Sequence, residues 1–311
     1  PEYESQKVAI PPVLEMVEYC EREKMTEIVI STPATVGMTG LLAAKLLGLP
    51  AIGIYHTDFP QYARVLSEGD HRMEALFWAW MDWFYGAMDL IYVNSRHYQD
   101  QWIQRGIPAS RVKILPRGID NISFHPSKRQ KDFWARYGVR DKLVFVYVGR
   151  VSKEKDLDVV IEAYRDLDAG GSKSVLAIVG DGPYLEQLRR ENRDVVFTGY
   201  LRGDPLWTAY ASADVFVFPS ATDTFGNVVL EANAAGLPAI VSGQGGPAEL
   251  VRDGQTGFVV RAHDAEAFRK AMGRFLDDPG LRERMGREAR AFVEDRNWTA
   301  AFEKFWNETK V

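Results

Sequence analysis

The sequence has a single cysteine, no long apolar run and no excess of basic residues, and each lack excludes a class of protein. Cys20 cannot form an intramolecular disulfide, which suits a reducing cytoplasm. No stretch reaches the roughly 18 apolar residues that a membrane-spanning helix needs, and no signal peptide is recognisable. The net charge of −5 argues against a nucleic-acid binder. We therefore expect a cytoplasmic globular protein of about two domains.

Short apolar runs alternate with helical patterns along the chain. In the first part we expect strands at residues 27–31, 51–55, 90–93 and 112–115, with helices at 8–24, 40–47, 70–86 and 96–105. In the second part we expect strands at residues 143–148, 175–179, 195–198, 215–218, 239–241 and 257–260, again with helices between them. This alternation predicts parallel sheets with crossover helices, and hence an α/β fold. The loops after such strands share the carboxyl edge of a sheet, where ligands bind.

Residues 214–241 are the most informative stretch. Their strand ends at Pro219 and a helical pattern begins near Gly226, so the loop between lies at the carboxyl edge. A helix amino terminus binds anions, and glycine permits close approach. Asp223 and Glu231 frame this anion site, and carboxylates accept the protons of hydroxyl groups. The pattern favours a ligand with both phosphate and hydroxyl groups, whereas a capping loop and a solvated helix face would explain two acids alone.

A second loop, directly after an expected strand, carries Arg150 and Lys155. Two cations at this edge indicate phosphate binding, although surface cations are usually solvated, as we expect for Lys153. Asp156-Leu-Asp158 has the Asp-x-Asp form of a metal site. It falls in the first turn of an expected helix, where the helix dipole favours acids. We therefore expect no required metal.

Together these motifs resemble family 4 glycosyltransferases, which are retaining enzymes of the GT-B fold. Asp223-x7-Glu231 around Phe225-Gly226 is similar to the family's Glu-x7-Glu signature, with Asp in place of the first Glu. The segment from Gly149 to Lys155 matches the Gly-Arg…Lys motif whose two cations hold the donor diphosphate. The resemblance implies two Rossmann-like doubly wound domains with a cleft between them.

The resemblance also assigns residues to a nucleotide-sugar site. Gly180 and Gly182 would form a turn beside the nucleotide, and Tyr200-Leu201 would border the base. Glu231 would hold ribose hydroxyls and Asp223 sugar hydroxyls. The implied donor-binding set is Gly149, Arg150, Lys155, Gly180, Gly182, Tyr200, Leu201, Phe225, Gly226, Asn227, Val228 and Glu231. The implied catalytic set is His56, Asp223, Arg150 and Lys155, with no cofactor and no metal.

Residues 55–62, Tyr-His-Thr-Asp-Phe-Pro-Gln-Tyr, directly follow an expected strand and are interpreted as a loop at the carboxyl edge. A lone histidine is usually a structural or surface residue. His56 nevertheless resembles the first-domain histidine that family members place near the donor sugar and the reacting centre. Asp58 would assist it or cap a helix.

The resemblance implies a domain plan. Residues 1–124 would form the acceptor-side domain, 125–140 a linker, 141–294 the nucleotide-sugar domain, and 295–311 a helix that crosses back to the first domain. Residues 116–126 resemble the family's Asn-Gly-Val-Asp…Phe-x-Pro connection, with Arg117 where Asn is common. The family's glycine-rich acceptor loop normally precedes everything in this chain, so we expect an incomplete first domain. Its open sheet edge would invite a companion chain or a second copy.

The leading hypothesis is a retaining hexosyltransferase that moves a sugar from GDP- or UDP-sugar to a lipid or glycan acceptor. The sequence of residues 55–62 resembles that of bacterial mannosyltransferases and glucosyltransferases, which favours GDP-mannose as the donor. A nucleotide-sugar epimerase and a donor-binding fragment of a split enzyme are the alternatives.

In helix 70–86, Met73, Leu76, Phe77, Trp80 and Phe84 follow a core stripe. Trp78 and Trp83 fall off that stripe, and peripheral contact with the inner face of a membrane is their alternative to domain packing.

Overall fold

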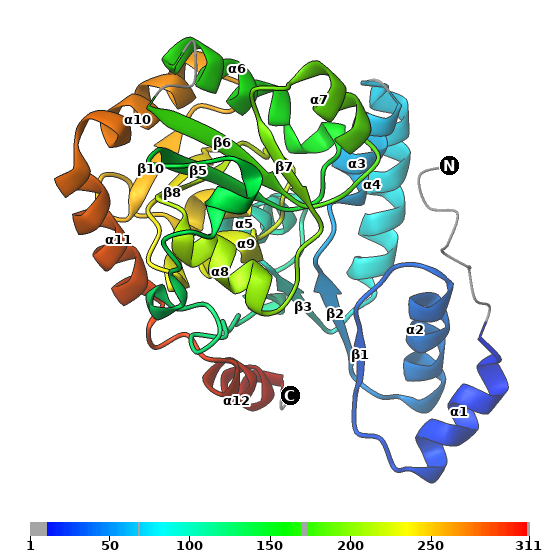
Figure 1. The fold of residues 1–311 in the computed structure, drawn as a ribbon. Coiled ribbons are helices and arrows are strands. Elements are labelled where there is room, and N and C mark those ends of the chain that lie inside the picture. The colour runs from blue at the N-terminus through cyan, green and yellow to red at the C-terminus, as the bar shows by residue number, and fades with distance from the viewer. Residues whose placement is uncertain (1–10, 68, 169–172, 310–311) are drawn as a thin grey trace. The chain divides into compact units, whose positions relative to one another are not determined.

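The computed structural model describes residues 11–67, 69–168 and 173–309. The chain divides into two compact units (Figure 1). The first comprises Pro1–Pro116 with Glu303–Val311, and the second comprises Arg117–Phe302. Each unit is described by itself.

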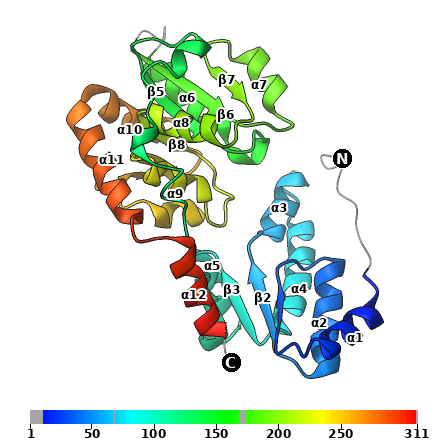
Figure 2. The ribbon, with the colours of Figure 1, turned by 60° about the horizontal axis from the view of Figure 1, so that its bottom comes forward.

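The first unit contains, within the described residues, a four-stranded parallel sheet in the order β1-β2-β3-β4. Its strands are β1 (Ile28–Ile30), β2 (Ala51–Tyr55), β3 (Leu90–Val93) and β4 (Val112–Ile114). Its helices are α1 (Val13–Arg22), α2 (Thr35–Leu47), α3 (Phe59–Leu66), α4 (His71–Gly86) and α5 (Arg96–Gln104). Helix α1 lies beside α2 and α3 beside α4 (Figure 2). Among the described strands β1 is at an edge, and its Val29 is exposed.

Helix α3 differs from the sequence analysis, which interpreted residues 55–62 as a loop. The helix starts at Phe59, because Asp58 accepts a hydrogen bond from the amide of Gln61 at 3.0 Å. Pro60 stands in the first turn, where an amide hydrogen would have no partner in the helix. Asp58 therefore has the helix-capping contact that was one of its two predicted roles.

The apolar stripe predicted for the aromatic helix α4 is confirmed in part, since Trp80 packs on the core of the first unit. Phe84 is buried as expected, but Met73 and Leu76 are exposed, so their assignment to the core was wrong. Trp78 packs on the core with its ring 5.9 Å from that of Trp102. Trp83 is 60% exposed. Packing within the unit thus explains Trp78 and leaves Trp83 as the exposed aromatic of the pair.

The second unit has a larger sheet. In the part of it that the structure describes, six parallel strands follow the order β10-β9-β8-β5-β6-β7. The strands are β5 (Leu143–Val148), β6 (Ser174–Val179), β7 (Val196–Gly199), β8 (Val215–Phe218), β9 (Ala239–Ser242) and β10 (Gly257–Val260). The helices are α6 (Leu157–Leu167), α7 (Leu185–Glu191), α8 (Asp204–Ser212), α9 (Asn227–Ala234), α10 (Ala265–Asp277) and α11 (Pro279–Val293). The sheet lies between α6 with α10 and α8 with α9 (Figure 1).

The strand order reverses between β5 and β8, so the loops after these two strands diverge to opposite faces of the sheet. Such a switch point opens a crevice at the carboxyl ends of the strands, and doubly wound proteins bind ligands there. Every residue of β8, and every residue of β5 after Leu143, is buried. Near-continuous apolar runs such as these are typical of strands covered on both faces.

Short 3-10 helices complete the described chain at Ala109–Arg111, Pro126–Lys128, Trp134–Tyr137, Lys153–Lys155 and Gly246–Leu250. Two of them fall within residues 125–140, which were expected to be a linker and which instead pack as part of the second unit. Phe133, Trp134 and Val139 are buried in its core. Arg129 donates to the Ala213 carbonyl at 2.8 Å and pairs with Asp214 at 2.9 Å.

The last helix, α12 (Trp298–Thr309), begins in the second unit and continues into the first. Within the first unit, the ring of Phe305 lies 5.0 Å from that of Tyr92, and Lys113 donates to the Glu308 carbonyl at 3.0 Å. Across the described ranges of the chain, we find no helix with the length and apolar character needed to cross a bilayer.

Candidate active site

A stacked pair of rings supports the loops at the switch point. Tyr147 near the end of β5 and Phe218 at the end of β8 lie 5.7 Å apart with an interplanar angle of 9°. The Tyr147 hydroxyl donates to the Arg150 carbonyl at 2.8 Å, which holds the first loop onto the sheet. Burial raises the pKa of Tyr147, and the negative charges of Asp223 and Glu154 raise it further.

Lys155 in the loop after β5 and Asp223 in the loop after β8 form an ion pair. Lys155 Nζ lies 2.7 Å from Asp223 Oδ2, and the two side chains are 17% and 24% exposed. A second bond joins the same loops, since the Thr222 hydroxyl donates to the Glu154 carbonyl at 3.1 Å. The structure therefore places the cation loop after β5 against the acidic loop after β8. The two side chains are close enough for one ligand to contact both.

Glycines bring the loop after β6 to the same place. A Cβ on Gly180 would lie 1.8 Å from the Gly149 carbonyl oxygen, and one on Gly182 would lie 2.2 Å from that of Val151. The Val151 amide donates to the Asp181 carbonyl at 2.9 Å. Direct contact between the two backbones thus requires residues without side chains at these positions.

The start of α9 is built in the same way. Gly226 precedes the helix with φ +89°, a conformation that glycine adopts without strain. The Gly246 amide donates to the Asp223 carbonyl at 2.9 Å, and a Cβ on Gly246 would lie 2.1 Å from the Thr224 carbonyl oxygen. The loop after β9 therefore supports the one that carries Asp223. The sequence analysis implied that this loop lies at the carboxyl edge but predicted no site residue in it. Its Gly-Gly-Pro sequence is typical of close backbone packing.

Glu231, inside α9, is held by Tyr210 of α8. The Tyr210 hydroxyl donates to Glu231 Oε2 at 2.7 Å, and burial raises the pKa of Glu231. Tyr210 was missed because a tyrosine within an apolar helical pattern is indistinguishable from an ordinary core residue. Its hydrogen bond fixes the direction of a carboxylate that would hold ribose hydroxyls.

Glu231→Gln is expected to separate binding from stability. Because the folded pKa of Glu231 is raised, the protonated form favours folding below that pKa, and this contribution is lost as pH rises through it. The neutral amide removes that loss, so the free energy of unfolding at pH 8 should rise or stay unchanged. Nucleotide affinity should fall about tenfold, because the amide offers fewer acceptor oxygens. Urea unfolding measures the stability and calorimetric titration measures the nucleotide affinity. A loss of stability in the variant would contradict the prediction.

The remaining predicted donor residues lie on the same edge of the second sheet or at the start of α9. Arg150, Leu201, Phe225 and Val228 are half-buried, whereas Asn227 is exposed and Tyr200 is 71% exposed. Lys153 is exposed as predicted, with Nζ 5.8 Å from the centroid of the Tyr184 ring. The side chains of the Asp-x-Asp segment have separate partners. Asp156 lies 3.3 Å from His263, and Asp158 accepts from the Tyr184 hydroxyl at 3.1 Å.

His56 and Asp58 belong to the first unit, directly after β2. His56 is exposed, and its Nδ1 lies 3.0 Å from the Thr57 hydroxyl. Asp58 is buried and accepts from the Tyr98 hydroxyl at 3.1 Å, and burial raises its pKa. Both lie at the carboxyl edge of their sheet, as predicted. The role of His56 near the reacting centre stays a prediction.

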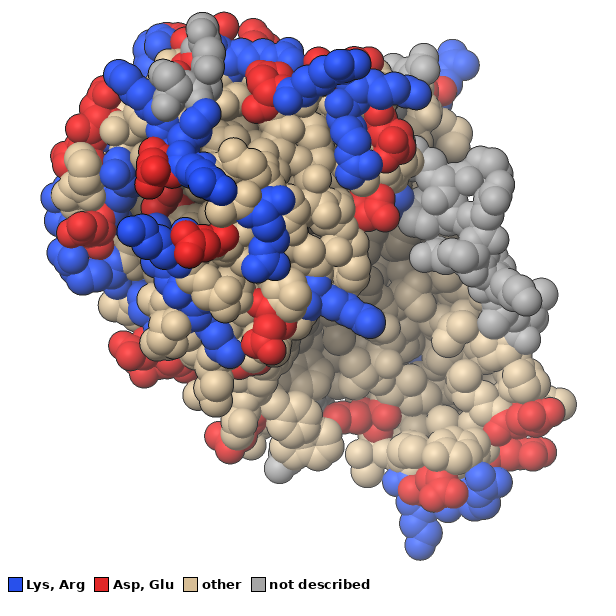
Figure 3. Space-filling model, in the orientation of Figure 1, with Lys and Arg blue, Asp and Glu red and all other residues tan. Residues whose placement is uncertain are grey.

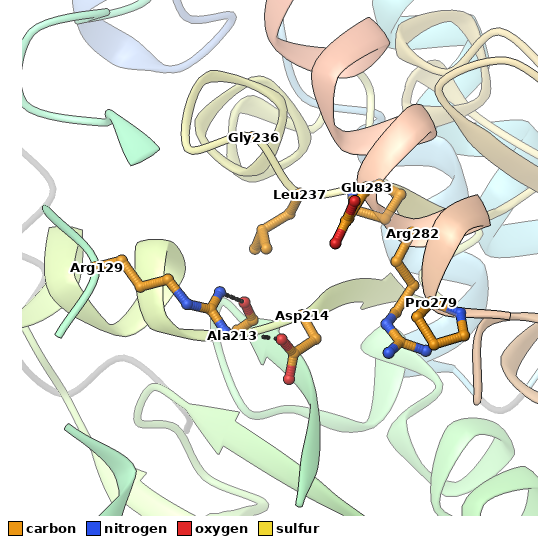
Figure 4. Close-up of a pocket in the computed structure, with 9 residues that line it drawn as sticks. Arg129, Ala213, Asp214, Gly236, Leu237, Pro279, Arg282 and Glu283 are labelled. Carbon is orange, nitrogen blue, oxygen red and sulfur yellow. Dashed lines mark hydrogen bonds and ion pairs between the residues drawn. The ribbon is translucent and has the colours of Figure 1, made fainter. Parts of the chain in front are cut away.

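Two adjoining cavities lie at the opposite, amino end of the second sheet, with volumes of about 810 and 400 Å³. Both are lined by Arg129, Asp214 and Arg282, and Figure 4 shows the smaller of the two. Arg129 is paired with Asp214, which also accepts from the Val144 amide at 2.8 Å. These groups hold the loops before β5 and β8 together. Acidic and basic side chains are interspersed over the second unit on the face drawn in Figure 3.

Two units built on parallel sheets, the second of them doubly wound, are typical of the GT-B fold of glycosyltransferases. The chain belongs to the glycosyl transferases group 1 family, whose sequence model matches residues 128–292. A second model, described as Glycosyltransferase Family 4, matches residues 1–121. The predicted membership of a glycosyltransferase family and the predicted α/β GT-B fold are thereby confirmed.

Similarity to named glycosyltransferases agrees with this family membership. The chain is 32% identical to sulfoquinovosyl transferase SQD2 of Arabidopsis thaliana, over 99% of this chain and 61% of that protein. It is 34% identical to a GDP-mannose-dependent alpha-mannosyltransferase of Mycobacterium tuberculosis, over 86% of this chain and 68% of that protein. The chain thus spans about two thirds of the length of these relatives. Anabaena Alr3699/HepE, solved in complex with UDP and glucose, shares the fold with a TM-score of 0.78 and 20% identity, over 95% of this chain and 80% of that one.

Proposed function

We propose that this chain carries the donor site of a retaining hexosyltransferase, which moves a sugar from a nucleotide-diphosphate sugar to a lipid or glycan acceptor without a metal. The observation that carries the proposal is the 2.7 Å pair between Lys155 and Asp223 at the switch point. The start of α9, four positions after Asp223 in the chain, adds a helix amino terminus, which favours anions. Together they offer groups for the two chemical parts of such a donor, its phosphates and its hydroxyls.

The chemistry follows from these groups. The bond between the sugar C1 and the diphosphate oxygen breaks, and its electron pair stays on the leaving diphosphate. Arg150, Lys155 and the amides at the start of α9 would stabilise that growing charge. The acceptor oxygen forms the new bond to C1, and its proton passes to the leaving phosphate. Neither Asp223 nor Glu231 is a nucleophile in this scheme, because both are assigned to hydroxyl groups.

Names of relatives support the choice of donor and acceptor. Three relatives of 30 to 34% identity are called GDP-mannose-dependent alpha-mannosyltransferases. Another, from Mycolicibacterium smegmatis, is named as an alpha-(1-6)-phosphatidylinositol monomannoside mannosyltransferase, whose acceptor is a lipid. GDP-mannose is therefore the donor that we favour.

His56 of the first unit would face the reacting centre, and a companion chain or second copy would cover the β1 edge.

A panel of nucleotide sugars tests the proposal. GDP-mannose, UDP-glucose and their free nucleotides are added either in EDTA or in magnesium. A thermal shift reports binding. Release of nucleoside diphosphate in the presence of a membrane lipid extract reports transfer. We expect one nucleotide to stabilise the protein in EDTA and its sugar to be transferred with its anomeric configuration kept. An absolute magnesium requirement, or no binding, would count against the site. Binding without transfer would favour the donor-binding subunit of a split enzyme.

A further inference from the structure

Arg117 is the first residue of the second unit, and its side chain faces the ring of Phe225 in the loop that leads into α9. Its guanidinium carbon is 5.6 Å from the centroid of the Phe225 ring. Phe225 immediately precedes Gly226, the residue that caps the amino terminus of α9. A cation is therefore held beside the helix end whose amides would receive the donor phosphates.

The backbone around Arg117 is fixed within the second unit. A Cβ on Gly118 would lie 2.5 Å from the backbone of Trp298, so the two segments touch directly. The Ile119 amide donates to the Arg296 carbonyl at 2.8 Å, and the Ile119 side chain is buried in the core. The position of Arg117 relative to Phe225 is thus set by this unit alone.

The surroundings of Arg117 favour an incoming anion. Burial lowers the pKa of its guanidinium, because the charged form loses hydration there. The face of the Phe225 ring compensates in part, since an aromatic face attracts a cation. An arginine fork matches the oxygen pairs of phosphate, carboxylate and sulfonate groups.

We propose that Arg117 is a donor-binding residue that contacts an anionic group of the nucleotide sugar. That group is either a phosphate oxygen or an acidic substituent of the sugar, which share the same chemistry toward a guanidinium. The inference rests on the proposed function, because it places the donor at the start of α9. It also gives a meaning to the arginine that stands where the resembling family commonly has asparagine.

Arg296 provides a matched control. It is also half-buried in the second unit, its guanidinium carbon lies 4.4 Å from the Phe292 ring centroid, and burial lowers its pKa. Phe292 belongs to α11 and not to the donor loops. The experiment is a calorimetric titration of wild type, Arg117→Gln, Arg117→Lys and Arg296→Gln. The probes are GDP, UDP, GDP-mannose, UDP-glucose and UDP-glucuronic acid, and thermal melts report whether each variant folds.

The expected result is a loss of affinity of at least tenfold in Arg117→Gln, with smaller loss in Arg117→Lys and none in Arg296→Gln. An equal loss for GDP or UDP and for the matching sugars assigns the contact to phosphate. A loss confined to UDP-glucuronic acid assigns it to the sugar. Unchanged affinity for every probe that wild type binds, or the same loss in Arg296→Gln, overturns the inference while the proposed function stands. A wild type that binds no nucleotide overturns both.

Discussion

Replacing Lys155 by methionine is expected to lower the rate of sugar transfer by about 100- to 1000-fold. Lys155 is the described cation whose pairing with Asp223 places it at the switch point. In the transfer step it would face the negative charge that grows on the leaving diphosphate, where a preorganised charge acts most strongly. Methionine keeps the unbranched shape of the side chain but removes the ammonium group, and with it the ion pair to Asp223. The measurement is kcat/KM for transfer, with circular dichroism to establish that the variant is folded.

Lys153→Met is the matched control for that loss. Lys153 stands two positions earlier in the same 3-10 helix, but it is exposed and lies near the Tyr184 ring. Its variant should keep transfer within about threefold of wild type, because exposed charges contribute little in high dielectric. Equal losses in the two variants would show that general positive charge on the loop matters, and the assignment of Lys155 would then be wrong.

The second large effect is expected from Gly180→Ala. The new Cβ would lie 1.8 Å from the Gly149 carbonyl oxygen, and φ of +150° is unfavourable for alanine. Overpacking and backbone strain together should cost about 3 kcal/mol of unfolding free energy. The displaced loop also carries Gly149 and Arg150, so nucleotide affinity should fall by at least about 100-fold. Urea unfolding and calorimetric titration measure the two effects.

Gly254→Ala separates strain from collision. Gly254 has φ of +74°, but an added Cβ would meet nothing within 4 Å. Its variant should therefore lose about 1 to 2 kcal/mol of stability from backbone strain alone and keep its nucleotide affinity. If Gly180→Ala lost no more than Gly254→Ala, the close approach of the two loops would not contribute to the site.

Much of the fold could be predicted because its strands are continuous apolar runs bounded by glycine, proline or polar residues. The expected bounds of β2, β3, β5, β8 and β10 agree with the structure. Helix α3 was missed because a proline and a loop-like polar stretch hide its start, which depends on the Asp58 cap. Met73 and Leu76 of α4 were wrongly assigned to the core because nearly every face of that helix carries aromatic or aliphatic residues. Burial there is decided by tertiary contacts with Trp102, which periodicity does not contain.

The candidate site shows the same division. Each motif could be assigned to the carboxyl edge, because that follows from strand–loop–helix order. Which side chains meet could not, since Lys155 and Asp223 are 68 positions apart and their contact depends on the strand order. Tyr210 and Gly246 support the site through a hydroxyl and a backbone approach that no local pattern marks. Arg117 was noted only as a departure from a motif.

A crystal structure with the bound nucleoside diphosphate tests the central claim most directly. The account predicts diphosphate oxygens within hydrogen-bond distance of Lys155 Nζ and of the amides that begin α9, with the ribose hydroxyls on Glu231. A nucleotide bound instead in the cavities around Arg129 and Arg282, at the amino end of the same sheet, would contradict it.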